Sequence, residues 1–534
     1  MVLYYLSYFL IIIYVVSVSL RSYHMLQQNL YNENNRYLKW VWKNKKLIFT
    51  NLDLYGIVFS FFILLTSNIP LINFFLVILM SVYVVAYFKY LEQRKTDQNK
   101  KPLVVTKRVR RLMVTVNILY LIPIIISIFA NHLAPICLLV LTIMTSLNFY
   151  IIFIALIINH PVERIVYHYY EAKAKEKLRS MPNLKIIGIT GSYGKTSCKN
   201  ILADILNVKY NALPTPKSLN TFNGLMITIN NKLSKFDDIF IAEMGAYVVG
   251  EIHKLCELVG PKYGIITSIG TAHLETFGSE ENIQKGKMEL IEFLPEDGIG
   301  VLNADDPKQK SYKIKNNCKI LWIGIDNIED ANVIAKDIKC SSNGTTFNVK
   351  FKGNDKEYKF ETKLLGRHNV YNILSALTLG YEFGISIKDL QLGVRKVRPV
   401  EHRLELKKLG NFYQIDDAYN SNPIGAKSAL DVLDMMDGDK VVVTPGMVEL
   451  GPKEEELNEI FGEQIAEVAD KVILIGEKRT KPIYHGLLNK KFKKENIYIS
   501  NDVREAYTIL NEIKGRKDLY ALFENDLPDT YTEK

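Results

Sequence analysis

Long apolar runs near the start of the chain restrict its fold more than any other feature. Four of them are Val2–Leu20, Leu71–Phe88, Leu112–Ala130 and Ala134–Ile158. Each is close to the ~20 residues that an α-helix needs to cross a bilayer. Leu52–Ser67 is a shorter run of the same kind. We therefore expect residues 1–160 to form a transmembrane domain of about five helices.

A secretory signal peptide is the alternative interpretation of the first run. That run has no basic region before it, and no small-residue cleavage site follows it. Further apolar runs also come after it, which is not typical of a cleaved leader. We interpret Val2–Leu20 as a retained span.

Basic residues are concentrated in the apolar third of the chain. Residues 1–180 contain 20 Lys and Arg against 7 Asp and Glu, a net charge of +13, whereas the rest of the chain has a net charge of −3. A basic patch can indicate a nucleic-acid partner. Here the charges flank hydrophobic runs, which favours loops on the inner face of a membrane and no nucleic acid.

The same charges predict an orientation. Arg21–Asn51 and Lys89–Arg111 are rich in Lys and Arg and are expected to be cytoplasmic. Asn68–Pro70 and Asn131–His132 contain neither residue and are expected to be outer turns. The N-terminus would then lie outside, and everything after Ile158 would lie in the cytoplasm of a multi-pass cell-membrane protein.

The predicted spans contain almost no ionisable side chain, which argues against an ion pathway or a proton relay. The domain would then serve as an anchor or as a platform for a lipid substrate. The five cysteines are odd in number and form no CxxC pair, so neither a disulfide framework nor a zinc site is indicated. A reducing compartment fits this pattern.

A glycine-rich loop opens the rest of the chain. Asn183–Thr190 is a β-branched run, and the apolar spacing of Lys195–Leu206 is helical. Between them, the backbone N–H groups of a loop and the positive end of a helix can meet phosphate, while Lys195 reaches terminal phosphates and Thr196 offers a hydroxyl to Mg²⁺. We expect ATP, bound by Gly191, Ser192, Tyr193, Gly194, Lys195, Thr196 and Ser197.

The match to the phosphate-loop pattern is not strict. The position five residues before Gly194 is Ile189, and the first glycine stands one residue earlier, at Gly188. A tight structural turn is the alternative.

Two further strands end in polar side chains. Phe240–Glu243 ends in a carboxylate, which would place Glu243 beside the loop as a Mg²⁺ ligand, or at the surface as a helix cap. Ile265–Ile269 leads to His273. Ligands bind at this edge of open α/β sheets, although a single histidine there is as readily a core residue.

In this order the motifs resemble those of the Mur ligase family, the ATP-dependent amide-forming enzymes of peptidoglycan synthesis, and most closely its type that adds D-alanyl-D-alanine. The similarity covers about residues 184–480. It is carried by Gly188–Ser197, Ser218–Thr221, Glu243–Ala246 with Gly250–Ile252, His273–Ser279 with Lys287, Asn303–Asp306, Gly366–Asn369 with Asn372, Arg403, Asp416–Pro423 and Glu449–Gly451.

The resemblance implies a role for several of these residues. Thr196, Glu243, His273 and Lys287 would bind metal, with Lys287 matching a family lysine that is carbamylated in several members. It further implies that Asn372 contacts adenine, and that Arg403 and Asp417 reach phosphate and ribose when the domains close. Lys195, His273, Lys287 and Arg403 would then be the catalytic residues. Alternatives remain for three of them: Asn372 as a polar residue inside a helix, Arg403 in a surface ion pair and Asp417 in a turn.

The resemblance also implies an architecture and a reaction. We expect an α/β chain in which a helical transmembrane bundle (1–160) and a charged linker helix (161–182) precede two domains. These are a central ATP-binding domain (183–397) and a Rossmann-like, doubly wound C-terminal domain (398–534). The second of these alternates strands and helices at Lys440–Thr444, Glu454–Ala469, Lys471–Ile475, Asn496–Ser500, Val503–Ile513 and Leu519–Phe523. The enzyme would form an acyl phosphate from ATP and a muramyl-peptide carboxylate, and an amino acid or a dipeptide such as D-Ala-D-Ala would then attack it.

Three departures from the family leave the substrate open. There is no room for the usual UDP-binding domain before the phosphate loop, Gly446 stands where an acidic residue is common, and the ending after Phe523 lacks an expected basic segment. The acceptor is therefore either a soluble UDP-linked muramyl peptide or a lipid-linked cell-wall precursor, which basic inner loops would attract. A nucleotide-dependent membrane scaffold without ligase activity is a third alternative.

Overall fold

The computed structural model describes residues 2–29, 31, 35–96, 103–341, 344–399, 402–418, 421–448, 450–513 and 518–525. They form two compact units, Met1–Tyr169 and Tyr170–Lys534. Residues 30, 32–34 and 97–102 of the predicted inner loops, and Tyr419, Asn420 and Glu449 of the motifs, lie outside the described residues.

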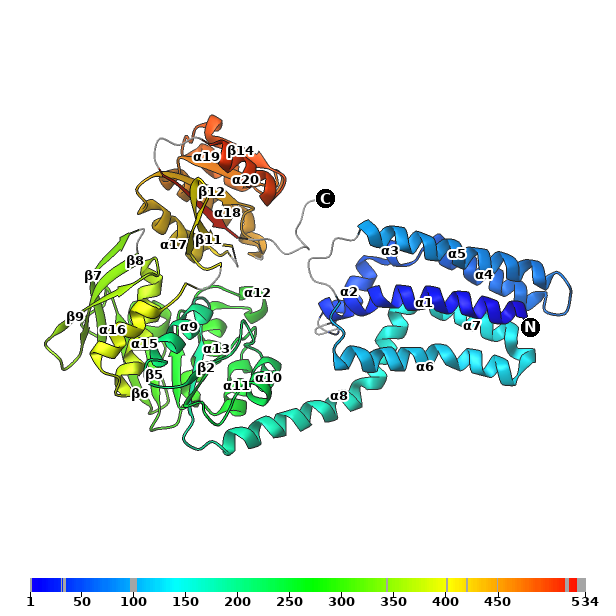
Figure 1. The fold of residues 1–534 in the computed structure, drawn as a ribbon, viewed down its shortest axis with the longest axis horizontal. Helices are drawn as coiled ribbons and strands as arrows, with labels where there is room; N and C mark the ends of the chain where they lie inside the picture. The colour runs from blue at the N-terminus through cyan, green and yellow to red at the C-terminus, as the bar shows by residue number, and fades with distance from the viewer. Residues whose placement is uncertain are drawn as a thin grey trace. The chain divides into compact units, whose positions relative to one another are not determined.

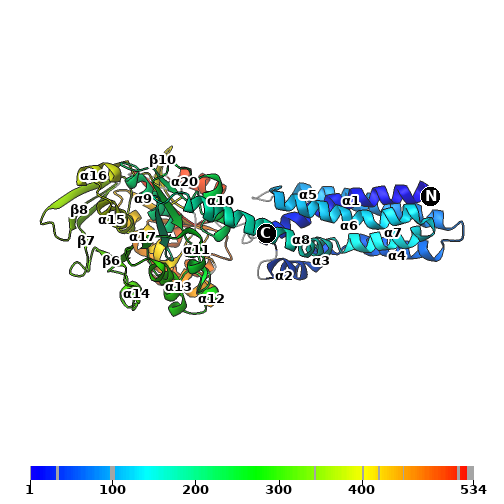
Figure 2. The ribbon, with the colours of Figure 1, turned by 90° about the horizontal axis from the view of Figure 1, so that it is seen from below.

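The first unit is entirely helical in the part that the structure describes (Figures 1 and 2). Four of its helices are long and apolar enough to cross a membrane: α1 (Val2–Gln28), α5 (Ile72–Thr96), α6 (Lys107–Phe129) and α8 (Asn148–Arg179). The shorter helices are α2 (Arg36–Lys43), α3 (Lys45–Ile48), α4 (Asn51–Leu65), the 3₁₀ turn η2 (Asn131–Leu133) and α7 (Ala134–Ser146). Their shared core is rich in tyrosine and aliphatic side chains.

The prediction that Ala134–Ile158 is one continuous span is wrong. The run is interrupted at Leu147, between α7 and α8. Asn148 begins α8 with a buried side chain that donates to Ser22 Oγ (2.9 Å) and accepts from Ser19 Oγ (3.0 Å). Tyr120 also donates to Asn148 Oδ1 (3.1 Å). The amide at the interruption thus links α1, α6 and α8 by hydrogen bonds, which lipid could not provide.

The shortest predicted span, Leu52–Ser67, forms α4, which has 15 residues and is not among the four long apolar helices. Because four crossings instead of five would put both ends of the bundle on one side, the predicted orientation depends on α4 crossing as well. That orientation stays a prediction.

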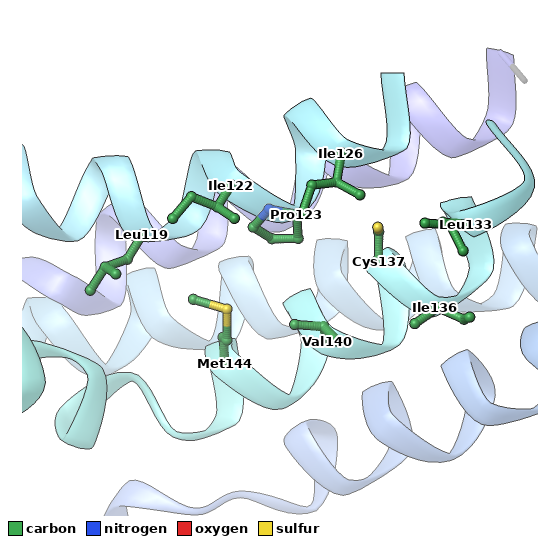
Figure 3. Close-up of a pocket in the computed structure, with 9 residues that line it drawn as sticks. All are labelled: Leu119, Ile122, Pro123, Ile126, Leu133, Ile136, Cys137, Val140 and Met144. Atoms are coloured by element: carbon green, nitrogen blue, oxygen red, sulfur yellow. The ribbon is translucent and has the colours of Figure 1, made fainter. Parts of the chain in front are cut away.

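Two surface features of the helical unit are notable. Arg111, near the start of α6, forms a bidentate ion pair with Glu163 of α8 (2.7 and 2.8 Å). An apolar groove of about 410 Å³ lies between α6 and α7, where Pro123, Cys137 and Met144 are among the lining residues (Figure 3). The linker helix predicted at 161–182 is the second half of α8, which ends at Arg179, and from Tyr170 onward that helix belongs to the second unit.

The second unit contains two sheets. The larger has the strand order β2-β3-β1-β4-β5-β6-β7-β8-β9, parallel from β2 to β7 and antiparallel from there on. Its strands are β1 (Lys185–Thr190), β2 (Ala212–Pro214), β3 (Ile239–Glu243), β4 (Tyr263–Ile266), β5 (Ile299–Asn303), β6 (Lys319–Gly324), β7 (Val333–Ser341), β8 (Gly344–Phe351) and β9 (Glu357–Thr362).

Helices cover both faces of the larger sheet (Figure 1). One face carries α9 (Lys195–Leu206), α15 (Arg367–Glu382) and α16 (Ile387–Lys396); the other carries α10 (Phe222–Asn231), α11 (Glu251–Val259) and α13 (Glu280–Phe293). The short helices α12 (Leu274–Phe277) and α14 (Pro307–Lys310) follow strands β4 and β5. Because β1 is covered on both sides, it reads as an almost continuous apolar run.

The smaller sheet has the order β10-β11-β15-β12-β13-β14, with only the pair β10–β11 antiparallel. Its strands are β10 (Glu405–Leu409), β11 (Phe412–Asp417), β12 (Asp439–Thr444), β13 (Lys471–Ile475), β14 (Ile497–Ser500) and β15 (Leu519–Glu524). The helices around it are α17 (Pro423–Asp434), α18 (Glu454–Val468), α19 (Lys481–Asn489) and α20 (Val503–Glu512), with 3₁₀ turns η3 (Gly451–Lys453) and η4 (Lys494–Asn496).

The predicted α/β class with a helical N-terminal bundle is confirmed. The helix predicted at Lys195–Leu206 and the strand predicted at Lys471–Ile475 have those bounds in the structure. The strand predicted at Ile265–Ile269 is shifted, because β4 covers Tyr263–Ile266.

Candidate active site

The glycine loop connects the carboxyl end of β1 to the start of α9. Gly191 (φ +148°) and Gly194 (φ +79°) adopt backbone conformations that residues with a Cβ rarely take. The loop is held from the end of β4: Ser192 donates its N–H to Ser268 O (2.7 Å), and Thr267 Oγ1 donates to Tyr193 O (2.5 Å). Strand, loop and helix N-terminus thus have the arrangement of a phosphate-binding site.

Lys195 is the first residue of α9 and turns back over the loop. Its ammonium donates to the carbonyls of Gly191 (2.7 Å) and Ser192 (3.3 Å). Burial lowers the pKa of Lys195 to about 8, the Glu243 carboxylate opposes this shift, and the Arg403 guanidinium adds to it. An incoming phosphate can take over these bonds and would restore full charge on the amine.

Thr196 and Glu243 form the corner where a metal ion fits. The Thr196 hydroxyl lies 3.2 and 3.1 Å from the two oxygens of the buried Glu243 carboxylate, and Asn220 Nδ2 donates to Oε1 (3.0 Å). A hydroxyl and a carboxylate are the hard oxygen ligands that Mg²⁺ prefers. Among the described residues no three Asp, Glu, His or Cys side chains are gathered in one place.

His273 and Lys287 both contact the segment that follows Glu243. His273 caps α12 in a left-handed conformation (φ 62°), and its ring is 4.5 Å from that of Tyr247. Burial, together with the Lys287 and Lys195 charges, lowers the pKa of His273 to about 4, so the ring is neutral and able to bind metal.

Lys287, in α13, is buried and donates to Ala246 O (3.2 Å). Its ammonium lies 5.2 Å from the centre of the Phe277 ring. Burial lowers the pKa of Lys287 to about 7, with the Lys195 charge as the next cause. About half of the amine is therefore uncharged at pH 7, and the uncharged amine is the form that reacts with CO₂.

Asn372 and Ser197 complete the part of the site on the larger sheet. Asn372 is buried in α15, where its amide faces the glycine loop: a Cβ added at Gly194 would lie 3.4 Å from Asn372 Oδ1. Ser197 is half-buried in the first turn of α9.

Arg403 and Asp417 belong to the C-terminal part. The Arg403 charge acts on Lys195 and also on Asp417 and Glu524. Asp417 ends β11 opposite Glu524, which ends β15 and is fully buried. Burial raises the pKa of both carboxyl groups, that of Asp417 to about 6; the Asp417 charge raises the pKa of Glu524 further, whereas the hydrogen bond with Glu524 lowers that of Asp417.

Two residues were missed by the sequence interpretation. Lys199 forms a buried ion pair with Glu243 (2.8 Å). Its position four residues after Lys195, on the same face of the helix, was the available signal. Glu524 accepts a hydrogen bond from Ser421 (2.6 Å). It was noticed only as part of an ending without basic residues.

Family comparisons agree with this geometry. Residues 189–380 match the Mur ligase middle domain, and residues 402–523 match the Mur ligase glutamate ligase domain.

Individual relatives agree as well. UDP-N-acetylmuramoyl-tripeptide–D-alanyl-D-alanine ligase of Bacillus subtilis is 32% identical over 340 residues, which cover 63% of this chain and 72% of the relative. The Escherichia coli enzyme of the same name is 31% identical over 302 residues, covering 56% and 66%.

Among solved structures, MurF from Acinetobacter baumannii aligns with a TM-score of 0.59 at 25% identity, covering 67% of this chain and 77% of that one. MurF from Thermotoga maritima in complex with ADP also aligns with a TM-score of 0.59, at 26% identity, covering 67% and 80%. The chain therefore belongs to the Mur ligase family and is an ATP-dependent ligase that uses Mg²⁺.

Proposed function

We propose that this ligase forms an amide bond in peptidoglycan precursor synthesis, adding D-Ala-D-Ala, or another amino acid or peptide, to a muramyl-peptide carboxylate. One observation carries the proposal. Lys195, Thr196 and Glu243 form a site for phosphate and Mg²⁺, and a neutral His273 and a Lys287 with a lowered pKa lie beside it. The names of the relatives supply the substrate class.

The proposed reaction has two steps, phosphorylation of the acceptor carboxylate and attack of the amine on the acyl phosphate. An acceptor carboxylate oxygen attacks the γ-phosphorus of ATP, the bond to the β–γ bridging oxygen breaks, and ADP leaves. The amine nitrogen then attacks the acyl carbon, the bond to the phosphate oxygen breaks, inorganic phosphate leaves, and one proton is lost from nitrogen. Activation is needed because a free carboxylate is a poor acyl donor.

The chain's own residues contribute mainly position and charge. Phosphoryl transfer is catalysed by such effects, with little covalent work left to the protein. We assign Lys195 and Arg403 to the phosphates, Thr196 and Glu243 to Mg²⁺, and Asn372 and Asp417 to the nucleoside. Mg²⁺, once bound, neutralises charge on the phosphate oxygens.

His273 and Lys287 are assigned to the acceptor side. In this proposal the Lys287 amine, held partly neutral by its burial, takes up CO₂ and becomes a carbamate, and the neutral His273 ring lies beside it as a second ligand. The negative charge of the carbamate would also reduce the excess of positive charge around His273, where Lys195 and Lys287 are both basic.

We further propose that the helical unit holds the ligase in the cell membrane with its catalytic domains in the cytoplasm. Four apolar helices of sufficient length and the Lys/Arg-rich segments near them support this placement. Both acceptor hypotheses are compatible with it. Family membership and the intact nucleotide site count against a scaffold without ligase activity.

ADP release by the detergent-solubilised chain tests the proposal. The assay contains Mg-ATP and D-Ala-D-Ala, with either a UDP-muramyl tripeptide or its lipid-linked equivalent as acceptor. Release that requires both acceptor and amine, and identifies the acceptor used, is the expected result. Lys195→Ala should abolish it, whereas Lys209→Ala should not, because the Lys209 amine contacts Gly384 O and the Tyr210 ring, away from the glycine loop. ATP turnover that ignores every acceptor and amine would refute the ligation proposed here.

A further inference from the structure

Lys199 lies one turn beyond the phosphate-loop lysine, and its side chain is buried. In α9 its ammonium is 2.8 Å from Glu243 Oε2, and both side chains are only 1% exposed. It also donates to the backbone carbonyl of Lys217 (2.5 Å). Lys217 has a left-handed backbone (φ 49°) and stands three residues before Asn220, another side chain that donates to Glu243.

Burying such an ion pair is expensive, because both charges lose their hydration. An apolar pair of the same volume is often as stable or more so, so stability alone is a weak reason for a lysine here. The place of the pair suggests a different reason. Glu243 is the carboxylate of the metal corner, 3.1 Å from the Thr196 hydroxyl.

The bonds on Glu243 fix its carboxylate from several elements. Oε1 accepts from Asn220 (3.0 Å), and Oε2 accepts from Lys199, while Thr196 lies between the two oxygens. The backbone N–H of Glu243 donates to Thr215 Oγ1 (3.2 Å). A carboxylate held in this way cannot rotate freely about its last bond.

Lys195 and Lys199 have different surroundings, although they share a helix face. The Lys195 ammonium lies on the loop carbonyls of Gly191 and Ser192, where phosphate would bind. The Lys199 ammonium lies behind the carboxylate, between Glu243 and the Lys217 carbonyl. One lysine therefore faces the nucleotide and the other faces the metal ligand.

We propose that Lys199 is a positioning residue for Mg²⁺: its ammonium orients the Glu243 carboxylate beside Thr196 and compensates its charge before the metal arrives. Partners that orient a metal ligand typically change metal affinity about 10- to 100-fold when removed. The inference depends only on the use of ATP and Mg²⁺, and is independent of the acceptor proposed above, because it is tested without acceptor or amine.

The test is binding of a fluorescent ADP analogue to the detergent-solubilised full chain, measured in EDTA and along a Mg²⁺ series. Lys199→Met is expected to raise the Mg²⁺ concentration for half-saturation about 10- to 100-fold, and to leave the affinity in EDTA within about twofold. Lys199→Arg, which keeps the charge but changes its position, is expected to shift half-saturation by a smaller factor, at least about threefold.

Lys209→Met is the matched control. The Lys209 ammonium also donates to a backbone carbonyl, Gly384 O (2.8 Å), but that carbonyl is not part of the nucleotide site. This variant should bind the ADP analogue as the wild type does, both in EDTA and along the Mg²⁺ series.

Two results would overturn the inference. If Lys199→Met weakens binding of the ADP analogue equally with and without Mg²⁺, Lys199 serves the nucleotide or the fold as a whole. If the Mg²⁺ dependence of binding is unchanged, Glu243 needs no such support. Circular dichroism and thermal unfolding report whether each variant folds. Should Lys199→Met fail to fold, Lys199→Arg decides by the same two criteria.

Discussion

Replacing Gly191 by alanine should disable nucleotide binding while leaving the chain folded. Gly191 has φ +148°, a region that L-residues occupy at a cost of about 1–3 kcal/mol. A Cβ there would lie 2.1 Å from Thr267 Oγ1 and 3.0 Å from the backbone N and O of Ser268. Thr267 and Ser268 hold the loop from β4, so the loop must move by about 1 Å or more to reach ordinary contact distance.

A displacement of about 1 Å in a positioning loop can cost about a hundredfold in rate, equal to ~2.7 kcal/mol. We expect Gly191→Ala to lower kcat/KM for ATP at least about a hundredfold and to weaken ADP binding in parallel. Steady-state ADP release and equilibrium binding of a fluorescent ADP analogue measure the two quantities.

Gly260→Ala is the control that separates backbone strain from steric contact of the added Cβ. Gly260 ends α11 in a left-handed conformation (φ +63°), and nothing lies within 4 Å of an added Cβ. The substitution should cost about 1–2 kcal/mol of stability and leave ADP affinity unchanged. Wild-type ADP affinity in a folded Gly191→Ala variant would refute the argument that contact with Thr267 and Ser268 sets the loop geometry.

Two other predictions follow from buried ionisable groups. With a pKa of about 7, Lys287 is roughly 90% uncharged at pH 8, against well under 1% for an ordinary lysine, so ligase activity should fall in CO₂-free buffer and return with bicarbonate. The activity of Lys287→Ala should not respond to bicarbonate, whereas Lys285→Ala, which changes an exposed lysine, should behave as the wild type. Wild-type activity that does not depend on CO₂ would exclude the carbamate. Because the folded pKa values of Asp417 and Glu524 are raised, the native state binds more protons than the unfolded state, and stability should decline as the pH rises through about 6. Thermal unfolding between pH 5 and pH 8 measures this decline, and Glu524→Gln should make it less steep. An equally steep decline in the variant would show that the carboxyl pair is not its cause.

Local patterns predicted the strand and the helix on either side of the glycine loop. The strand, loop and helix around Gly191 and Lys195 are consecutive in the chain, so their spacing alone sets their arrangement. Glu243 and His273 could be placed nearby because parallel strands bring their carboxyl ends to one edge, whatever the strand order. The structure adds the order β3-β1-β4 and the contact of the His273 ring with Tyr247, four residues after Glu243.

Contacts between distant residues were not predictable in the same way. Lys199 and Glu243 are 44 residues apart, and no periodicity reveals that their side chains meet. The interruption at Leu147 was missed for a similar reason: hydropathy counts Asn148 as one polar residue within an apolar run, whereas its partners come from α1 and α6. Both cases depend on long-range hydrogen bonds, which composition does not encode.

The same distinction explains why ATP chemistry is clearer in this chain than substrate choice. The residues assigned to phosphate and metal lie mostly on the larger sheet, where the match to the family is unbroken from Ile189 to Gly380. The departures from the family pattern, at Gly446 and after Phe523, lie at the ends of neighbouring strands β12 and β15 of the smaller sheet. There Asn525 donates to the carbonyl of Gly446 (2.6 Å), and Glu524 faces Asp417 where basic residues were expected. Because the proposal assigns Asp417 to the nucleoside, a change of charge at that edge bears on ATP as well, whereas the hydrogen-bond partners of the Glu243 carboxylate, Thr196, Lys199 and Asn220, all lie in the part of the chain that carries the larger sheet.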